Sequence, residues 1–356
     1  MSKACDIQNT VKQNQDHQCH FVLKSTQINA YEQRHMHAME QPEMLMNRAA
    51  GFVARYISTH FNTQPVFFII GPGNNGADGL LCAKMLQQQG WEVYCFVLCQ
   101  KTIKPKWPRL RLDDGSFYDP LCVVADHAIE TFDIPAKALV IDAGFGIHQR
   151  LPLSAQMRSI IAQMHQKEAY IISIDLPTGV SCDDGQVDVG AVKAKKTLTF
   201  QAFKPAHLLQ PSAFHCGDVS VYDLGIKISD HEISMQVNHP ALWLHHFPVP
   251  TFDMHKYSRG ALVILVGRKR PGAAILAALA ARRLCGAVVL CADHTQADVI
   301  RTTYPGFIVE EINDTISFID FIDGFKANAI LIGPGAGLIG SVRDKIIKIL
   351  NKNIPL

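Results

Sequence analysis

Continuous apolar runs, each followed by glycine, asparagine or aspartate, restrict most strongly how this chain can fold. Residues 65–70 form such a run, and the glycine-rich segment 71–79 follows it. A helical stretch at 80–89 comes next, before a second apolar run at 92–98. Strands that are buried on both faces have this continuous apolar character, and a strand, a helix and a strand form a right-handed crossover between parallel strands. The sequence therefore predicts an α/β fold.

The alternation continues along most of the chain and divides it into two domains. Further strands are predicted at 138–141, 170–174, 197–200 and 219–222, with helical segments at 26–61 and 154–165. A later stretch carries predicted strands at 261–266, 287–291 and 329–332, with helices at 273–284 and 342–351. We expect a polar tail at 1–25, a first domain at 26–229, a proline-containing linker at 230–253 and a second domain at 254–356.

The composition excludes several classes of protein. A hydrophobic fraction of 48% over 356 residues is typical of a globular chain of about two domains. A net charge of +2 provides no general basic field, so we expect no nucleic-acid partner. We see no secretory signal and no apolar run long enough to span a membrane, and therefore expect a cytoplasmic protein.

Cysteine usage favours neither disulfides nor zinc. The ten cysteines include no C-x-x-C pair, and most stand in apolar stretches, so we interpret them as small core residues. His17, Cys19 and His20 suggest a metal site, but no second ligand cluster stands at a useful spacing. We therefore assign them to a solvated tail.

Chemistry-bearing residues follow three of the predicted strands. Asn75 lies in the glycine-rich segment after the first strand, Asp142 follows 138–141, and Asp175 follows 170–174. Ligands of open parallel sheets bind outside the carboxyl ends of the strands. We therefore expect these three side chains to meet in one site on one rim of the sheet.

The segment 71–76 matches the G-x-G-x-x-G pattern of dinucleotide-binding enzymes. That function requires an acidic residue at the end of the second strand to hold a ribose. Here the second strand ends in Val97, Leu98 and Cys99, so a redox enzyme is disfavoured. The glycines still permit close approach of a ligand, and the following helix N-terminus favours an anion.

Three motifs in this order resemble the NAD(P)H-hydrate epimerase family, also called the YjeF N-terminal domain. They are Gly-Pro-Gly-Asn-Asn-Gly-Ala-Asp-Gly at 71–79, Asp-Ala-Gly-Phe-Gly at 142–146 and Asp-Leu-Pro-Thr-Gly at 175–179. Leu-Met-Asn-Arg-Ala at 45–49 precedes them, and Thr-Leu-Thr-Phe at 197–200 with Lys204-Pro205 follows. The resemblance covers about residues 26–228. It implies a Rossmann-like three-layer sandwich that interconverts the R and S epimers of hydrated NADH and NADPH (NADHX and NADPHX), a nucleotide-repair reaction.

The resemblance also implies the residues of the site. A potassium ion would be held by Asn75, Asp142 and Thr178, whose oxygen atoms suit a hard cation. Substrate would be bound by Asn74, Asn75, Gly76, Ala77, Asp78, Gly146, Ile147, His148, Gln149, Arg150, Leu151, Pro152 and Asp175. Ala77 stands where the family usually has Gly, a strained substitution if the position requires positive φ.

We hypothesise that Asp175 is catalytic and handles protons as the substrate hydroxyl leaves and returns. Its place after an apolar strand predicts partial desolvation, which can raise the pKa of a carboxyl group. The alternative is that Asp175 only forms a hydrogen bond to the substrate.

The second domain resembles the start of an ADP-dependent NAD(P)H-hydrate dehydratase, which is ribokinase-like. The resemblance rests on His255-Lys256, Pro271-Gly-Ala273 and Gly-Pro-Gly-Ala-Gly at 333–337, and it implies that Ala273 and Gly337 contact the hydrated nucleotide. The later family motifs do not occur before Leu356. We therefore expect a C-terminally truncated, incomplete and inactive dehydratase, since ADP or ATP would serve only a complete domain. Its exposed strand edge would allow homo-oligomers to form.

Three other functions remain open. The chain could be a nucleotide-binding protein that retains the epimerase pocket without turnover. It could be a kinase-like enzyme that uses ATP or ADP through its C-terminal segment. It could also be an oligomeric scaffold, supported only by the expected strand edge.

Overall fold

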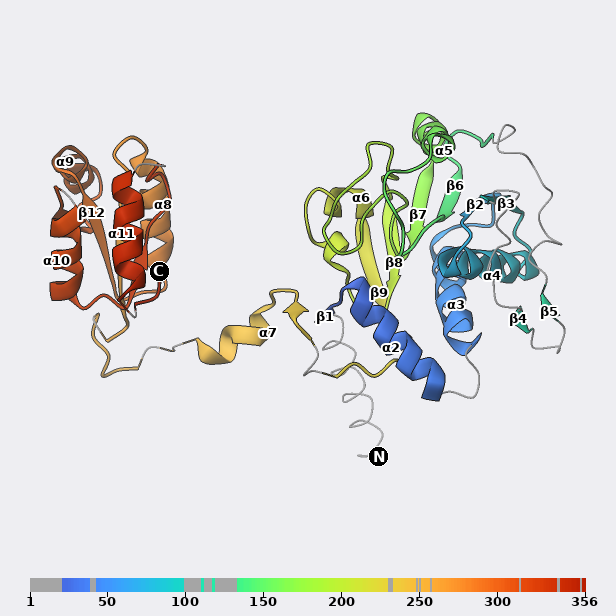
Figure 1. The fold of residues 1–356 in the computed structure, drawn as a ribbon, viewed down its shortest axis with the longest axis horizontal. Coiled ribbons are helices and arrows are strands. Elements are labelled where there is room, and N and C mark those ends of the chain that lie inside the picture. The colour runs from blue at the N-terminus through green and yellow to red at the C-terminus, as the bar shows by residue number, and fades with distance from the viewer. Residues whose placement is uncertain are drawn as a thin grey trace. The chain divides into compact units, whose positions relative to one another are not determined.

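The structure is a computed structural model in which the chain divides into two compact units between Pro240 and Ala241 (Figure 1). It describes residues 21–38, 43–98, 110–111, 117–118, 133–229, 233–247, 249, 251–256, 258–313, 315–337, 340–352 and 354–356. His17, Cys19 and His20 lie outside the described residues, so their assignment stays a prediction. Four of the six described cysteines are buried, none of the six forms a disulfide, and Cys95 and Cys285 are half-buried.

A parallel sheet of six strands forms the centre of the first unit, in the order β3-β2-β6-β7-β8-β9. The strands are β2 (Val66–Ile70), β3 (Val93–Val97), β6 (Leu139–Ala143), β7 (Tyr170–Ile174), β8 (Lys196–Phe200) and β9 (Asp218–Tyr222). Every neighbouring pair is parallel, which confirms the predicted sheet. The strand order changes direction between β2 and β6, and such a switch point leaves a crevice at the carboxyl ends of the two strands.

Helices cover both faces of this sheet. Side chains alternate between the faces of a strand, so Phe68 and Ile70 of β2 belong to one core while Phe67 and Ile69 belong to the other. The first core also includes side chains from α2 (Ser25–Ala38), α3 (Glu43–His60) and α4 (Asn74–Gln88). The second includes side chains from α5 (Ala155–Gln166), whose first turn is capped by the hydroxyl of Ser154. The expected α/β three-layer sandwich is confirmed (Figure 1).

Two segments of the first unit are packed against it, although the sequence predicted a polar tail at 1–25 and a linker at 230–253. Phe21, Val22 and Leu23 are buried, although they fall in the expected tail. The short strand β1 (Phe21–Val22) pairs with β10 (Met235–Gln236), which falls in the expected linker. The linker also contains the short helix α7 (Pro240–Trp243) and a 3-10 turn at Leu244–His246. The unit also contains α6 (Ala213–Cys216), a 3-10 turn at Pro205–His207, and two paired strands, β4 (Leu110–Arg111) and β5 (Phe117–Tyr118).

Helix α4 begins six residues earlier than the predicted start at Leu80, so the expected loop is wrong from Asn74 onward. The glycines that suggested a loop are required for packing. A Cβ atom at Gly76 would lie 1.9 Å from Gly71 O, and one at Gly79 would lie 2.5 Å from Ala143 Cβ. Ala77 is buried within this helix and has no positive φ, so the Gly-to-Ala difference from the family causes no backbone strain there.

A second parallel sheet, of four described strands in the order β13-β12-β11-β14, forms the second unit. Its strands are β11 (Ala261–Leu265), β12 (Ala287–Ala292), β13 (Ile308–Glu311) and β14 (Ala329–Leu331). The helices are α8 (Pro271–Ala281), α9 (His294–Thr303), α10 (Thr315–Phe325) and α11 (Gly340–Leu350), of which α9 and α10, like β13, were not predicted. The Ile330 N–H of the edge strand β14 donates to Pro355 O at 2.9 Å, so the last residues contact this edge of the sheet.

Within the described ranges, no helix has the length and apolar character needed to cross a membrane.

Candidate functional site

The chain segments that leave β2 and β6 are in direct contact at the switch point. A Cβ atom at Gly71 would lie 1.5 Å from Gly144 O, so the first segment can pass the second only because Gly71 lacks a side chain. A Cβ atom at Gly144 would lie 2.5 Å from the Thr178 hydroxyl oxygen, which comes from the turn after β7. The ends of β2, β6 and β7 therefore form one continuous site.

Asp142 is the buried anchor of this site. Thr178 donates to it twice, through its main-chain N–H to Oδ2 at 2.8 Å and through its hydroxyl to Oδ1 at 2.6 Å. The Ser173 hydroxyl donates to Oδ2 at 2.9 Å, and the Gly144 N–H to Oδ1 at 3.2 Å. Burial raises the pKa of Asp142, although these hydrogen bonds act to lower it. The network fixes Asp142 and Thr178 next to each other, and their role as ligands of one ion, which the family resemblance implies, stays a prediction.

Asn75 is the polar side chain without a partner at the site. It is buried in the first turn of α4, and neither Oδ1 nor Nδ2 has a hydrogen-bond partner within the described part of the chain. Leaving such a group buried and unsatisfied costs about 1–3 kcal/mol. A Cβ atom at Gly146 would lie 3.4 Å from Asn75 Cβ and 3.4 Å from Asp175 Oδ2. Asn75 and Asp175 therefore flank Gly146, and the Asn75 amide is suited to a ligand.

Asp175 is held at three of its four polar positions. Its φ angle of +65° is a left-handed conformation, which Asp tolerates better than most residues but which still stores strain. Its N–H donates to Leu198 O at 2.8 Å, and its carbonyl oxygen lies 2.9 Å from His207 Nε2. Oδ1 lies 2.6 Å from Lys204 Nζ and accepts from the Thr199 hydroxyl at 2.9 Å. Oδ2 is the remaining position and faces Gly146.

The expected rise in the pKa of Asp175 is contradicted. Burial acts to raise this pKa, but the charge and hydrogen bond of Lys204, with the Thr199 hydroxyl, bring it below its ordinary value. Two other carboxyl groups, those of Asp78 and Glu32, interact with Asp175, and their pKa values shift in the opposite direction. Burial, followed by the negative charge of Asp175, raises the pKa of Asp78 well above its ordinary value and also raises that of Glu32. The site therefore combines an ionised carboxylate with carboxyl groups that retain protons more readily.

The remaining predicted substrate residues differ in their surroundings. Gln149 is engaged in the protein, because its amide oxygen accepts from Gly179 N–H at 2.7 Å and its amide nitrogen donates to Pro177 O and Val180 O. His148 lies 2.7 Å from the Asn29 amide of α2. Ile147 packs against the first core, and Gly76 and Ala77 are buried. Asn74, Arg150 and Pro152 are exposed, and Leu151 is half-buried.

Sequence reasoning gave no role to Lys204, Thr199 or Ser173, and it did not single out Glu32 and His207. Lys204 is 1% exposed and lies beside Asp175, although it follows that residue by 29 positions. One signal was available, since Lys204 stands between Phe203 and Pro205 shortly after an apolar strand. Lysine is seldom fully buried unless it is paired, so this setting could have indicated an ion pair.

A second candidate site lies at the switch between β11 and β14 of the second unit. A Cβ atom at Gly267 would lie 1.9 Å from Gly335 O, and one at Gly335 would lie 2.0 Å from Arg270 O. The segment before α8 thus contacts the glycine-rich segment 333–337. Ala273 in the first turn of α8 and Gly337, which has a φ of +81°, are both exposed at this edge.

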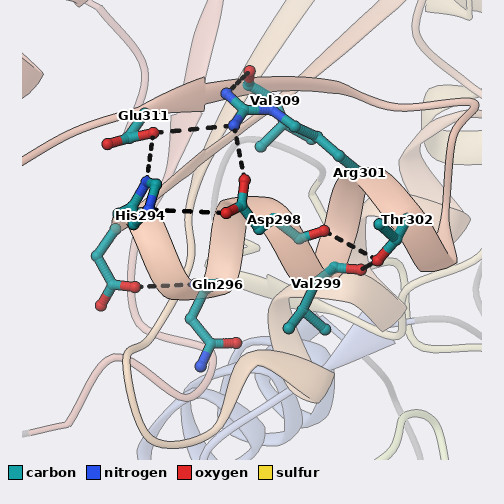
Figure 2. Close-up of polar contacts among 9 residues, drawn as sticks. His294, Gln296, Asp298, Val299, Arg301, Thr302, Val309 and Glu311 are labelled. Atoms are coloured by element: carbon teal, nitrogen blue, oxygen red, sulfur yellow. Dashed lines mark hydrogen bonds and ion pairs between the residues drawn. The ribbon is translucent and has the colours of Figure 1, made fainter.

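Other polar and concave features have a simpler explanation. Figure 2 shows His294, Asp298 and Arg301 of α9 in contact with one another or with Glu311 of β13. Exposed ion pairs of this kind contribute little free energy.

A groove between α3 and α4, lined by Arg55, Ser58 and Gln88 among others, lies near the amino ends of the strands, whereas the candidate site lies at their carboxyl ends. Among the described residues, no group of three His, Cys, Asp or Glu side chains is placed to hold a metal ion.

Two family models match the chain. Residues 42–206 match the YjeF-related protein N-terminus, and residues 262–356 match NAD(P)H-hydrate dehydratase. The second match runs to the last residue and gives no support to the expected truncation or inactivity of the dehydratase domain.

Curated relatives agree with these matches. The bifunctional NAD(P)H-hydrate repair enzyme of Dictyoglomus turgidum is 27% identical over 87% of this chain and 64% of the relative. Its counterpart in Methanothermobacter thermautotrophicus is 30% identical over 82% of this chain and 58% of the relative. The NAD(P)H-hydrate epimerase of Leuconostoc citreum is 29% identical over 52% of this chain and 82% of the relative. The chain spans about three fifths of the length of the bifunctional relatives.

Two solved structures are also similar. A yeast protein is 21% identical with a TM-score of 0.42, over 60% of this chain and 98% of its own. A ribokinase-like superfamily protein of Enterococcus faecalis is 23% identical with a TM-score of 0.25, over 29% of this chain and 36% of its own. Residues 42–206 of the chain are thus similar to the YjeF-related protein N-terminus and residues 262–356 to NAD(P)H-hydrate dehydratase, and the curated relatives described above are NAD(P)H-hydrate repair enzymes and an NAD(P)H-hydrate epimerase.

Proposed function

We propose that the first unit interconverts the R and S epimers of NADHX and NADPHX. The observation that supports this most directly is the position of Gly146, which is flanked by Asp175 Oδ2 and by Asn75, whose buried amide has no partner among the described residues. Asp175 and Asp78 interact at this site, and the opposite directions of their pKa shifts, lowered for Asp175 and raised for Asp78, favour Asp175 as the base and Asp78 as the acid. The similarity to the NAD(P)H-hydrate epimerase of Leuconostoc citreum supports a hydrated nicotinamide nucleotide as the substrate.

The proposed reaction exchanges a hydroxyl group between the two faces of the ring. Protonated Asp78 donates a proton to the ring hydroxyl, the carbon–oxygen bond breaks, and water leaves with the bonding electron pair. The ring carries the resulting positive charge beside the Asp175 carboxylate. A water molecule forms the new carbon–oxygen bond on the other face and gives a proton to Asp175 Oδ2. Transfer of one proton back to Asp78 through solvent restores both groups, so the exchange consumes nothing.

We further propose that Asn75, Asp142 and Thr178 hold a potassium ion. The partnerless Oδ1 of Asn75 supports the proposal, together with a donor set of one amide, one carboxylate and one hydroxyl. When bound, the ion would supply positive charge beside the anionic part of the nucleotide. The residues of this chain bind and orient the substrate. The segment 146–152 lines it, and the exposed Asn74 begins helix α4, which faces the substrate.

Direct observation of epimer exchange tests the proposal. The chain is mixed with R-NADHX and a dehydratase specific for the S epimer, and the two epimers are separated by chromatography over time. We expect the R epimer to disappear at a rate proportional to the concentration of this chain, and more slowly when potassium is replaced by a large organic cation. Binding of NADPHX without any exchange would instead support the nucleotide-binding alternative.

For the second unit we propose that the hydrated nucleotide binds where the segment before α8 meets residues 333–337, with Ala273 and Gly337 in contact. The close backbone approach of Gly267 to Gly335 and the start of a helix beside them support a phosphate-bearing ligand. Loss of NADHX on addition of ADP to the purified chain measures dehydratase activity directly. That measurement also decides between a working and an inactive dehydratase half.

A further inference from the structure

We propose that Lys204 is a positioning residue of the epimerase site, which holds Oδ1 of Asp175 and leaves Oδ2 directed at Gly146 for reaction. The inference rests on the proposed function, because it assigns a second residue to the reaction of Asp175. It comes from contacts between residues that are far apart in the sequence, since Lys204 enters the site from the segment after β8.

The Lys204 ammonium group uses its three donors on three fixed acceptors. Nζ lies 2.6 Å from Asp175 Oδ1, 2.6 Å from the Thr199 hydroxyl oxygen and 3.0 Å from Phe200 O. The residue is 1% exposed, so solvent does not compete for these bonds. With all three donors engaged, the position of Nζ is fully determined by the protein.

Thr199 and His207 complete the arrangement around Asp175. Because Thr199 Oγ1 accepts from Lys204, its own hydrogen is left to donate to Asp175 Oδ1, at 2.9 Å. His207 Nδ1 accepts from the main-chain N–H of Lys204 at 3.0 Å, so in a neutral ring Nε2 carries the hydrogen and donates to Asp175 O at 2.9 Å. Burial and the charge of Lys204 lower the pKa of His207 to about 4, which keeps the ring neutral. Residues 204 and 207 thus hold both the carboxylate and the carbonyl of Asp175.

The arrangement is poorly explained by stability alone. Moving an ammonium group and a carboxylate out of water costs several kcal/mol for each ion, and a buried ion pair is often no more stabilising than apolar side chains of similar volume. The Lys204–Asp175 pair instead occurs together with a strained φ at Asp175 and with an oxygen, Asp175 Oδ2, to which no described group donates. Strain and unsatisfied groups gather where a structure is built for binding or reaction.

Other charged groups act on the same pair. Glu32 of α2 and Asp78 of α4 both interact with Asp175, and Glu32 also interacts with Lys204. Lys204 is therefore a positive group that acts on both Asp175 and Glu32, and Asp78 is linked to it through Asp175. Its removal would favour protonation of Asp175, the group that the proposed reaction requires in its ionised form.

Two substitutions test the proposal, each compared with the unsubstituted chain of residues 1–356. Lys204→Met removes the ammonium group and keeps the volume. Thr199→Val removes only the second donor to Asp175 Oδ1 and keeps Lys204. The matched control is Lys196→Met, since Lys196 is also a buried lysine paired with an aspartate, Asp218, but it stands at the start of β8 away from the site.

Two readouts separate positioning from a structural role. The first is the pH dependence of kcat and kcat/KM for epimer exchange. The second is the titration of the Asp175 carboxyl carbon by 13C NMR, assigned by its loss in Asp175→Asn. The NMR readout needs no activity, so a wild-type chain without epimerase activity would refute the proposed function and still leave the effect of Lys204 on Asp175 measurable.

We expect kcat of Lys204→Met to fall about 100-fold, the scale associated with small misplacement of a reacting group. Its acid limb should move up by about one to three pH units, the usual effect of losing an adjacent opposite charge. Thr199→Val should show smaller changes in the same directions, and Lys196→Met should show neither. An Asp175 carboxyl that titrates as in the wild type in both site variants would overturn the proposal. If Lys204→Met does not fold, Thr199→Val alone decides by the same criterion.

Discussion

The Thr178 hydroxyl donates to Asp142 Oδ1 at 2.6 Å while the Thr178 N–H donates to Oδ2 at 2.8 Å. Thr178, in the turn that follows β7, thereby donates to both oxygens of the Asp142 carboxylate near the end of β6. A single hydroxyl group therefore connects the stability of the site with its proposed affinity for a cation.

Replacing Thr178 separates these two contributions. Thr178→Val keeps the shape of the side chain but removes the donor to a buried carboxylate, which should lower the free energy of unfolding by about 1–3 kcal/mol. The same variant should lose any stimulation of epimer exchange by potassium. Thr178→Ser keeps the hydroxyl and should retain both properties. Urea unfolding and activity at increasing KCl concentrations measure them, and an unchanged potassium response in the valine variant would contradict the proposed ligand.

Replacing Asp175 tests its proton transfer. Asp175→Asn keeps the volume and one oxygen but cannot accept a proton, so turnover should fall by about 100- to 10,000-fold, the usual contribution of a general base. Asp223→Asn, in the exposed turn after β9, is the control and should leave turnover unchanged. Unchanged turnover in Asp175→Asn would leave this side chain only a hydrogen-bonding role.

Gly146 should control access to the site. A Cβ atom there would lie 3.4 Å from both Asn75 Cβ and Asp175 Oδ2, a tight but tolerable contact that occupies the space between them. We therefore expect Gly146→Ala to raise KM about tenfold or more, equivalent to about 1.4 kcal/mol of lost binding, with little change in the unfolding midpoint. Gly51→Ala on α3, where nothing lies within 4 Å of the new Cβ, is the control. Equal KM values for the two variants would argue against substrate at Gly146.

Asp188 should make the first unit sensitive to acid. Its carboxylate accepts from Arg158 Nε at 2.8 Å and Nη2 at 2.7 Å, as well as from the N–H groups of Leu153 and Gly190. The hydrogen bonds from Arg158 lower the pKa of Asp188 from an ordinary 3.8 to about 2. Because the folded pKa is the lower one, the stabilisation is complete above pH 3.8 and is lost as the pH falls towards 2.

Asp188→Asn should consequently lower the free energy of unfolding at pH 7 by about 2 kcal/mol. The difference from the wild type should shrink as the pH falls below the ordinary aspartate pKa. Denaturant unfolding at several pH values measures this, with Asp223→Asn in the exposed turn after β9 as control. A difference that stays constant with pH would show that the Asp188 charge is not responsible.

Much of the fold could be predicted because it depends on local patterns. The strand at 170–174 was predicted to the residue, and the other strand predictions agree with the structure to within about two residues. Helix α4 was placed too late because Gly76 and Gly79 have the local character of a loop. Glycine is needed at these two positions because a side chain would collide with Gly71 or Ala143, and a local sequence pattern carries no information about such contacts.

The sequence by itself determined that parallel strands bring Asn75, Asp142 and Asp175 to one rim, because apolar runs specify buried strands and parallel strands share their carboxyl edge. Only the tertiary structure decided how these groups are charged and oriented. Asp175 is ionised and directed by Lys204, a residue 29 positions later in the chain. The strength of an electrostatic interaction depends on distance and burial, and both are set by how distant segments pack together.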